Sequence, residues 1–295
     1  MLSFDRMLQE RRQLVDYKNG REYPLGFLLE GVQHFELDAI MSCGQAFRWD
    51  KISENTYSGI AHGLYREITQ QDDTLIFHGV SRAEFESVWF NYFDFGRDYG
   101  ALKAELCAHD RLRDAILYSP GIRVLRQDGW EALCTFILSA NNNIPRIKTA
   151  VNRLCEHFGR EIPGGFDFPA PRCLAAFSPE DLAPIRCGFR AKYIIDAARA
   201  VSEGRVDLSA LYTLPLPQAQ AMLQSIHGVG PKVAHCTLLF GFARVECLPV
   251  DVWISRALEA WFPDGLPDEV SGVAGIAQQY IFHYARTGNV LPKGS

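Results

Sequence analysis

The fold is decided by the stretch from Leu223 to Trp253, which reads LQSIHGVGPKVAHCTLLFGFARVECLPVDVW. At its start, Met222 and Ile226 lie on one face of an amphipathic helix that we expect over residues 216–226. The glycines of Gly228 to Gly230 interrupt this helix, and Pro231 begins a second one, at the first helical position that proline prefers. The sequence therefore predicts two helices joined by a tight glycine turn.

This turn has two interpretations. Glycines can adopt positive φ, so the backbone N–H groups of the turn can converge on a phosphate, toward which the second helix also directs its positive dipole end. Such a hairpin grips a nucleic-acid backbone without reading its sequence. The alternative is a plain turn between helices with a glycine at the C-cap, and hairpin geometry alone does not decide between them. The candidate phosphate-binding residues are Gly228, Val229 and Gly230.

Two charged residues near the turn favour a catalytic role over a purely structural one. Lys232 occupies the second position of the new helix, where the positive dipole end makes a lysine unfavourable for ordinary stability. The dipole and desolvation favour a neutral amine, which is the form that acts as a nucleophile. Asp251 stands where a further helix begins, and its ordinary role is an N-cap. A carboxylate and an activated amine can together attack an electrophilic carbon and stabilise its developing positive charge.

Five stretches, in order, carry a resemblance to a known family. They are CGQAFRW at 43–49, NNNIPRI at 141–147, GFRAKY at 188–193, GVGPKVAHC at 228–236 and PVDVW at 249–253. With them the chain resembles the helix–hairpin–helix DNA glycosylases and, more narrowly, the eukaryotic-type 8-oxoguanine DNA glycosylases. The resemblance covers most of the chain. It implies a base-excision repair enzyme that removes 8-oxoguanine, preferentially opposite cytosine, and then cuts the strand by β-elimination.

The resemblance also implies a role for individual residues. Lys232 would attack C1′ and form a Schiff base, while Asp251 would stabilise the oxocarbenium-like charge and orient the lysine. The residues implied for binding the damaged base are Gly44, Cys236, Gln278 and Phe282. In the family the glycine carbonyl accepts the N7 hydrogen of the oxidised base, the cysteine and phenylalanine sandwich it, and the glutamine binds its Watson–Crick edge. From the residues alone, the cysteine and phenylalanine are core residues, and the glycine belongs to a bulge or turn.

A second set is implied to face the opposite base and the DNA: Asn141, Arg146, Phe189 and Arg190. On their own, the asparagine is a cap or turn residue, the arginines are solvated charges and the phenylalanine is a core ring. Phe189 stands where the family has a tyrosine wedge that enters the base stack. Trp253 stands where animal members typically have a histidine, which puts the phosphate contact from that position in doubt.

The expected fold is α+β and mainly helical, with an N-terminal antiparallel sheet followed by an all-α helix–hairpin–helix core. Short strands are expected between residues 34 and 80, with turns at 53–55, 62–63 and 71–73. Helices are expected at 82–93, 98–108, 110–117, 128–140, 145–158, 179–186, 190–203, 216–226, 231–243, 251–261 and 267–286. The break at Ser119-Pro120-Gly121 predicts an N-terminal α+β domain at 1–120 and a helical glycosylase domain at 121–295.

Composition narrows the remaining possibilities. A net charge of −5 counts against a DNA-binding protein, but basic residues dominate locally at 141–160 and 186–199. The eight cysteines contain no C-x-x-C pair, so neither a zinc site nor a disulfide framework is indicated. No long apolar span or targeting segment is evident. We therefore expect a monomer without metal or cofactor that binds duplex DNA containing an oxidised purine, in the bacterial cytoplasm with the nucleoid or in a eukaryotic nucleus, and not at a membrane.

Two rival functions stay open on the sequence. A monofunctional glycosylase for alkylated bases has the aspartate but lacks the lysine, so the presence of Lys232 argues against this function. A non-catalytic hairpin module that only binds DNA would have no reason to combine Lys232, Asp251, Gln278 and Phe282.

Overall fold

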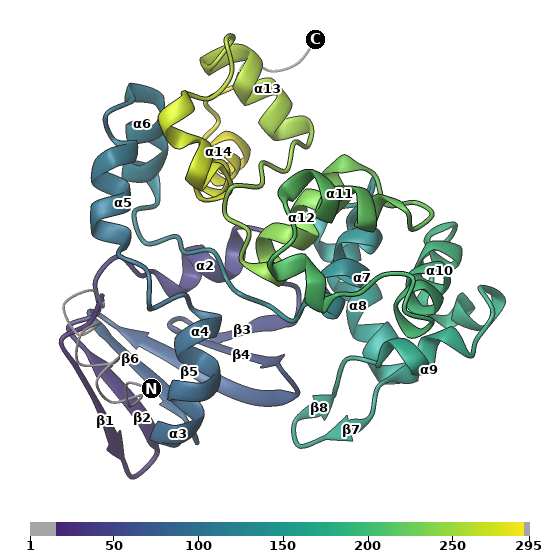
Figure 1. Cartoon of the computed structure of the whole chain (residues 1–295). Helices are drawn as coiled ribbons and strands as arrows, with labels where there is room; N and C mark the ends of the chain where they lie inside the picture. Colours follow the sequence, from purple (N-terminus) through teal and green to yellow (C-terminus); the bar gives the residue numbers. More distant parts are fainter. Residues whose placement is uncertain (1–15, 292–295) are drawn as a thin grey trace, which may run out of the picture.

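The computed structural model describes residues 16–291, in which a β-sheet lies at one end and helices form the rest (Figure 1). The sheet is antiparallel and six-stranded, in the order β1-β2-β6-β5-β4-β3. Its strands are β1 (Asn19–Tyr23), β2 (Gly26–Glu30), β3 (Trp49–Ser53), β4 (Thr56–Ala61), β5 (Leu64–Gln71) and β6 (Thr74–His78). The predicted meander and its three turns are confirmed, because β3 to β6 pair in sequence order.

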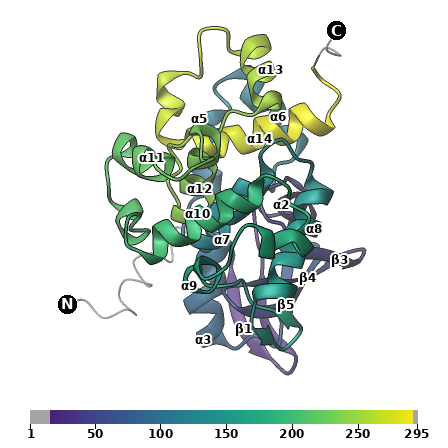
Figure 2. The same cartoon turned by 90° about the vertical axis from the view of Figure 1, so that its right-hand side faces the viewer.

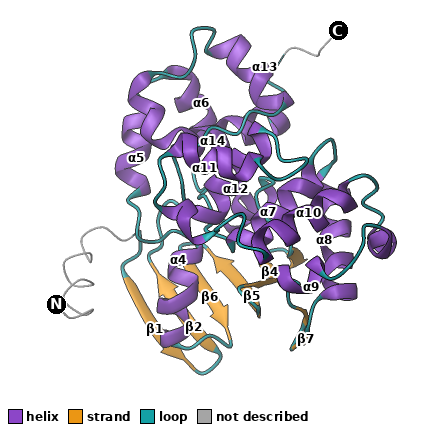
Figure 3. Ribbon diagram, turned by 45° about the vertical axis from the view of Figure 1, so that its right-hand side comes forward, coloured by secondary structure: helices purple, strands orange, loops and turns teal. Residues whose placement is uncertain are grey.

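One face of the sheet is buried because apolar residues alternate along the strands. Phe77 in β6 pairs with Phe27 in β2 on one side and with Ile68 in β5 on the other. All three are at most 1% exposed. They pack into an aromatic core with the helical segment over residues 82–92, which lies across this face (Figures 1 and 3). Strand alternation therefore builds one of the two hydrophobic cores.

The helices were mostly predicted within two residues at each end. The confirmed ones are α5 (Tyr99–Leu106), α6 (Asp110–Tyr118), α7 (Gly129–Ser139), α8 (Ile144–Phe158), α10 (Arg190–Ser202), α11 (Leu216–Gln224), α12 (Pro231–Phe242) and α13 (Val252–Trp261). The segment expected at 82–93 is α3 (Arg82–Glu84), a π-helical turn (Phe85–Trp89) and α4 (Phe90–Tyr92). The one expected at 267–286 begins as a 3₁₀ helix (Asp268–Val273) and continues as α14 (Ala274–Thr287).

Other elements differ from the prediction. The segment expected at 179–186 is a 3₁₀ helix (Glu180–Ile185) that contains Pro184, which lacks the N–H that an α-helix needs. The strands β1 and β2, and α2 (Leu37–Ser42), were missed because such short segments carry little periodicity. Also unpredicted are α9 (Pro171–Ala175), a 3₁₀ turn (Ser209–Tyr212) and the strand pair β7 (Glu161–Ile162) and β8 (Gly165–Phe166).

The second core lies in the helical part, where α7 packs against α12 and α14 packs against α6 and α13 (Figure 1). Helix α10 packs against α7 and α9, and α7 also packs against α8 (Figure 2). The division of the chain at residue 120 stays a prediction, and residues 1–15 and 292–295 of the predicted domains lie outside the described residues. No helix between residues 16 and 291 is long and apolar enough to cross a membrane.

A buried arginine ties these parts together. Arg123, which is 0% exposed, donates to the carbonyls of Phe93 and Asp94 and pairs with Asp16 at 2.8 Å. Its guanidinium lies 4.1 Å from the ring centroid of Tyr99. A buried guanidinium is stable only where most of its donors are satisfied, and here the acceptors come from separate segments.

We therefore predict that Arg123→Met lowers the free energy of unfolding by about 3–5 kcal/mol, because it leaves the carboxylate of Asp16 buried without its partner. Denaturant unfolding measures this change. The matched control is Arg21→Met, which breaks an exposed pair with Glu30 and should cost at most about 1 kcal/mol. Equal effects of the two substitutions would contradict the assigned role of Arg123.

Candidate active site and nucleic-acid interface

The hairpin between α11 and α12 uses its two glycines differently. Gly228 adopts φ +85°, the left-handed region that favours glycine, whereas Gly230 has φ −91° and is the N-cap of α12. The N–H of Val229 donates to the carbonyl of Ile226 at 3.1 Å, and the valine side chain is buried. The turn thus needs its first glycine for conformation, while a Cβ at the second would meet nothing within 4 Å. Of the two glycines, both of which can adopt positive φ, only Gly228 does so.

Helix α10 supports this hairpin. A Cβ built on Gly228 would lie 2.3 Å from the ring of Tyr193, so only glycine permits the ring to lie against the turn. The ring centroid of Tyr193 is 5.1 Å from that of His227, and the backbone N–H of His227 donates to Asp196 at 2.8 Å. These contacts fix the direction in which the hairpin amides point.

Lys232 is held by α7. Its Nζ donates to Oγ of Ser139 at 3.0 Å and lies 5.4 Å from the ring centroid of Phe136. The hydroxyl of Ser139 donates in turn to the carbonyl of Phe136 at 2.7 Å. The lysine is half-buried and has a defined orientation before any substrate binds. Sequence reasoning missed Ser139 and Phe136, because no local pattern relates residues so far apart.

Asp251 caps α13. One carboxylate oxygen accepts the N–H of Ile254 at 2.9 Å, so the N-cap role is real, and its second oxygen has no such contact within residues 16–291. Asp251 and Lys232 form no ion pair among the described residues. Both act on the buried thiol of Cys236: burial raises the pKa of Cys236, Lys232 lowers it and Asp251 raises it. The thiol of Cys236 therefore lies within electrostatic range of both charges.

The bonds of His235 fix the loop that leads to Asp251. Nδ1 of His235 contacts the carbonyl of Leu248 at 2.9 Å, and Nε2 contacts Oε1 of Gln220 at 3.0 Å. The imidazole thus bridges α11 and the loop between α12 and α13. Because His235 lies on the same helix as Lys232, it sets the position of the carboxylate relative to the amine.

Gly44 lies against the last helix. Its φ is +79°, and a Cβ there would lie 3.3 Å from the ring of Phe282 and 3.2 Å from Ile144. Nε2 of Gln279 donates to the carbonyl of Cys43 at 2.8 Å, which anchors the peptide that precedes the glycine. The carbonyl of Gly44 itself accepts no hydrogen bond from residues 16–291. Gly44 therefore lies close to an aromatic ring and keeps an unused backbone acceptor.

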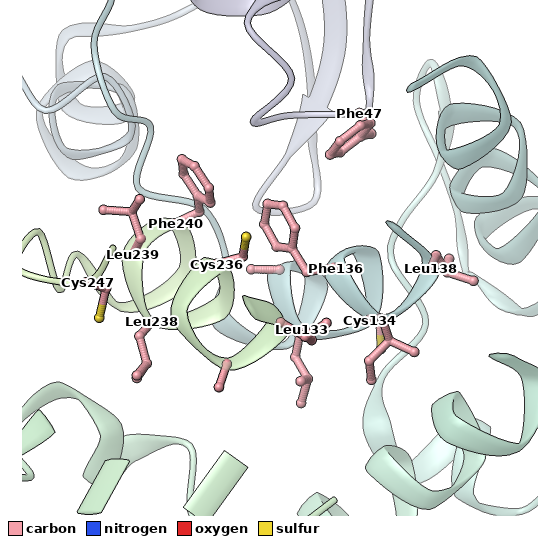
Figure 4. Packing of buried hydrophobic residues seen from close by; sticks show 14 of the residues in the cluster. Phe47, Leu133, Cys134, Phe136, Leu138, Cys236, Leu238, Leu239, Phe240 and Cys247 are labelled. Carbon is pink, nitrogen blue, oxygen red and sulfur yellow. The ribbon is translucent and has the colours of Figure 1, made fainter. Parts of the chain in front are cut away.

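Gln278 provides a second free acceptor. The side chain is 5% exposed, and its Oε1 is buried without a hydrogen-bond partner in the described structure. Gln278 precedes Phe282 by one turn of α14, so both side chains project from one face. In Figure 4, Cys236 and Phe136 point toward the same side of the α7–α12 pair, where Phe47 also lies. The predicted base-binding residues Gly44, Gln278 and Phe282 are thus brought together.

The predicted opposite-base residues line a separate cavity of about 320 Å³, which contains Asn141, Arg146 and Arg190 in its wall. Arg190 donates to the carbonyls of Ala140, Asn141 and Cys187, so it holds the turn between α7 and α8. Asn141 has φ +49°, and Arg146 is exposed. The cavity therefore presents donors next to a structured turn.

Phe189 lies beside this cavity rather than in a core. Its side chain is 52% exposed, which is unusual for a phenylalanine and contradicts the core interpretation. Its ring centroid lies 4.5 Å from the guanidinium carbon of Arg190 and 5.7 Å from the ring centroid of Tyr193. A supported, exposed ring can enter a gap in a base stack. Between residues 16 and 291, no cluster of three or more His, Cys, Asp or Glu could hold a metal ion.

A helix–hairpin–helix, two unused acceptors and a cavity lined by arginines are the features expected of a DNA glycosylase. Residues 134–269 match the family described as HhH-GPD superfamily base excision DNA repair protein. Residues 28–133 match the family described as 8-oxoguanine DNA glycosylase, N-terminal domain. The chain therefore belongs to the 8-oxoguanine DNA glycosylase family within this superfamily.

Known proteins agree with this assignment. The N-glycosylase/DNA lyase of Saccharomyces cerevisiae is 32% identical over 273 residues, covering 79% of this chain and 70% of the yeast protein. The 8-oxoguanine glycosylase/lyase of Clostridium acetobutylicum, in complex with double-stranded DNA containing cytosine opposite 8-oxoG, is 34% identical with a TM-score of 0.87. That comparison covers 93% of this chain and 100% of the clostridial one. MBOgg1 bound to a low-affinity DNA ligand is 39% identical, with a TM-score of 0.85, over 91% of this chain and 98% of MBOgg1.

The predicted family, fold class and enzyme class are confirmed by these matches. The two rival functions, an alkyl-base glycosylase and a non-catalytic hairpin module, are not favoured. The roles of the individual site residues stay predictions.

The hairpin geometry generates a prediction. Gly228→Ala should lower the free energy of unfolding by about 2 kcal/mol or more, because alanine is strained at positive φ and its Cβ displaces Tyr193. Gly230→Ala is the matched control and should leave stability within about 1 kcal/mol, because its φ is negative and its surroundings are open. Thermal and denaturant unfolding of both variants provide the measurement. A stable Gly228→Ala variant would refute the requirement for glycine at this turn.

Proposed function

We propose that the protein removes 8-oxoguanine from duplex DNA, preferentially opposite cytosine, and then cleaves the strand. The observation that carries this proposal is the pair of unused acceptors on two residues next to Phe282, namely the buried Oε1 of Gln278 and the carbonyl of Gly44. A guanine ring presents N–H donors on its Watson–Crick edge, and 8-oxoguanine adds one at N7. A buried acceptor without a donor costs about 1–3 kcal/mol, so a base that supplies both donors is selected.

The reaction follows from the amine and the carboxylate. The damaged nucleotide first rotates out of the DNA duplex. Nζ of Lys232, as a neutral amine, then attacks C1′ of this nucleotide while the bond from C1′ to the base breaks. The departing base takes one proton from the amine. The nitrogen lone pair then breaks the bond from C1′ to O4′, which leaves a protonated Schiff base, and O4′ takes a proton from water to become a hydroxyl. Loss of a proton from C2′ then expels the 3′ phosphate by β-elimination, and water releases the lysine. Asp251, whose charge acts on the same thiol as the charge of Lys232, stabilises the positive charge that develops on the sugar.

The strand opposite the lesion binds at the cavity lined by Asn141, Arg146 and Arg190. Phe189 fills the gap that the flipped nucleotide leaves, and Arg146, Arg190 and Asn141 face the orphaned cytosine. Cytosine offers acceptors at O2 and N3, which match arginine donors, whereas adenine would place a donor toward them. The hairpin of Gly228, Val229 and Gly230 binds a phosphate through its backbone amides.

The remaining expectations belong to the same proposal. The partner is duplex DNA that contains an oxidised purine, and the protein acts as a monomer without a cofactor. It works wherever the chromosome lies, in the bacterial cytoplasm or, in a eukaryote, in the nucleus.

The nucleophile is tested by borohydride trapping on a duplex that carries 8-oxoguanine opposite cytosine. Wild-type protein should be trapped covalently, and Lys232→Gln should lose trapping while its affinity for the lesion duplex changes little. Trapping depends on the Schiff base, whereas binding depends on the pocket and the hairpin. Undiminished trapping in Lys232→Gln would place the nucleophile elsewhere.

Asp251→Asn provides the companion test, because asparagine caps a helix almost as well as aspartate. If the charge acts in the transition state, single-turnover base release should slow by about 100-fold or more with little change in DNA affinity. A rate close to that of the wild type would reduce Asp251 to its cap of α13.

A further inference from the structure

Ion pairing of the arginines changes along the chain. Beyond residue 145, Arg160, Arg205 and Arg244 pair with a carboxylate, and the other described arginines form no ion pair. Each arginine described between residues 16 and 145 pairs with a carboxylate. These are Arg21, Arg48, Arg66, Arg82, Arg97, Arg111, Arg113, Arg123 and Arg126. An acidic chain can neutralise its arginines in this way, so several unpaired arginines gathered around one cavity need another explanation.

Four arginines without a carboxylate partner lie around one cavity. They are Arg146, Arg153, Arg186 and Arg190, and none forms an ion pair within residues 16–291. Between residues 16 and 291, no acidic residue lines this cavity of about 320 Å³, whose other polar side chains include those of Asn141, Asn142 and Thr149. Like charges repel each other, so such a group is unfavourable unless an anion joins it. Arg190 alone has its guanidinium bonded, and only to backbone carbonyls.

Arg186 also has a strained backbone. Its φ of +56° and ψ of 38° place it in the left-handed region, at the C-cap of the 3₁₀ helix Glu180–Ile185. Glycine takes this conformation without cost, whereas an arginine takes it at a cost in stability. The side chain is exposed at the cavity and is not needed for packing. Neither packing nor backbone conformation therefore explains an arginine at this position.

Arg153 extends the same surface along α8. It follows Arg146 by two turns on one face of this helix, a rise of about 10 Å. A single base beside Arg146 cannot also occupy the position of Arg153. The orphaned cytosine offers only two acceptors, and Asn141, Arg146 and Arg190 already suffice for it. Arg153 and Arg186 are therefore in excess of what base recognition requires.

We propose that Arg153 and Arg186 form a phosphate-binding subsite for the backbone of the DNA strand opposite the lesion. A phosphodiester carries a full negative charge, and its oxygens match the two-pronged donor geometry of guanidinium groups. Their contact adds affinity for the backbone of this strand, while the reading of its orphaned base is left to Arg146 and Arg190. The assignment rests on the proposed function for the identity of the bound duplex. The affinity of the subsite is independent of the base sequence and sensitive to salt.

The test compares three proteins: wild type, Arg153→Gln/Arg186→Gln, and Arg111→Gln/Arg113→Gln, which removes the same charge from α6. Binding to an undamaged duplex is measured over a range of salt concentrations. The cavity variant should bind more weakly, and the slope of log K against log salt should fall by about 1 for a single lost phosphate contact. The α6 variant should keep the wild-type slope. Arg186→Gly in place of Arg186→Gln removes the backbone strain with the charge, so a folding defect cannot mimic the result.

Two further measurements separate the subsite from base reading. Methylphosphonate linkages, which are neutral, are placed one at a time in the strand opposite the lesion; one of them should weaken the wild type but not the cavity variant. Single-turnover excision opposite each of the four bases should keep its preference for cytosine in the cavity variant. An unchanged salt slope would mean that these arginines are only solvated charges, and a lost cytosine preference would make them base readers. Either result overturns the subsite. Failure of wild-type trapping would overturn the proposed function alone, because the undamaged duplex tests the subsite without a lesion.

Discussion

The hydrogen bond from Gln279 to the carbonyl of Cys43 is the contact on which the candidate base pocket depends. It joins residues 236 positions apart at 2.8 Å, and the side chain of Gln279 is 2% exposed. Arg286, from the same helix, donates to the carbonyl of Ser42 at 2.8 Å. With these two bonds α14 fixes the loop from which Gly44 turns toward Phe282. A glycine is needed there, because φ is positive and the ring lies close.

A second set of bonds carries this rigidity toward the nucleophile. The buried amide of Gln45 donates to the carbonyl of Arg123 and accepts the N–H of Leu125, both at 2.8 Å. Gln127 donates to the carbonyl of Gln45 at 2.7 Å, and its own N–H donates to the carbonyl of Phe240 on α12 at 2.7 Å. Lys232 lies at the start of that helix. The loop next to the base pocket and the helix with the amine are therefore held by one hydrogen-bonded path.

The sequence predicted the parts of the site that are local in the chain. The hairpin, the helix after it and the cap at Asp251 were predictable, because turn glycines, Pro231 and a capping carboxylate act over a few residues. The orientation of Lys232 by Ser139 was not, since it depends on how α7 packs against α12. The negative φ of Gly230 could not be predicted either, because a glycine permits a positive φ without requiring it.

In the sheet and the helices, length decided what could be predicted. The strands β4 and β6 alternate clearly between half-buried and buried positions, so their alternation was visible. The six residues of α2 complete fewer than two turns, and their apolar residues fit a strand as well as a helix. The family resemblance supplied what neither pattern could, namely that Gly44, Gln278 and Phe282 belong to one site. The structure brings these residues together without testing their chemistry.

The central claim is that the Gly44 carbonyl and Gln278 select a base by its donors. The most direct measurement is single-turnover excision, opposite cytosine, of 8-oxoguanine, guanine and 8-bromoguanine. The bromo base has a large substituent at C8 but keeps an acceptor at N7, so it would meet the glycine carbonyl acceptor to acceptor. An unsatisfied pair costs about 1–3 kcal/mol, so 8-oxoguanine should be released at least about tenfold faster than either of the other two. Equal release of 8-oxoguanine and 8-bromoguanine would contradict the account, because the pocket would then read the C8 substituent and not the hydrogen at N7.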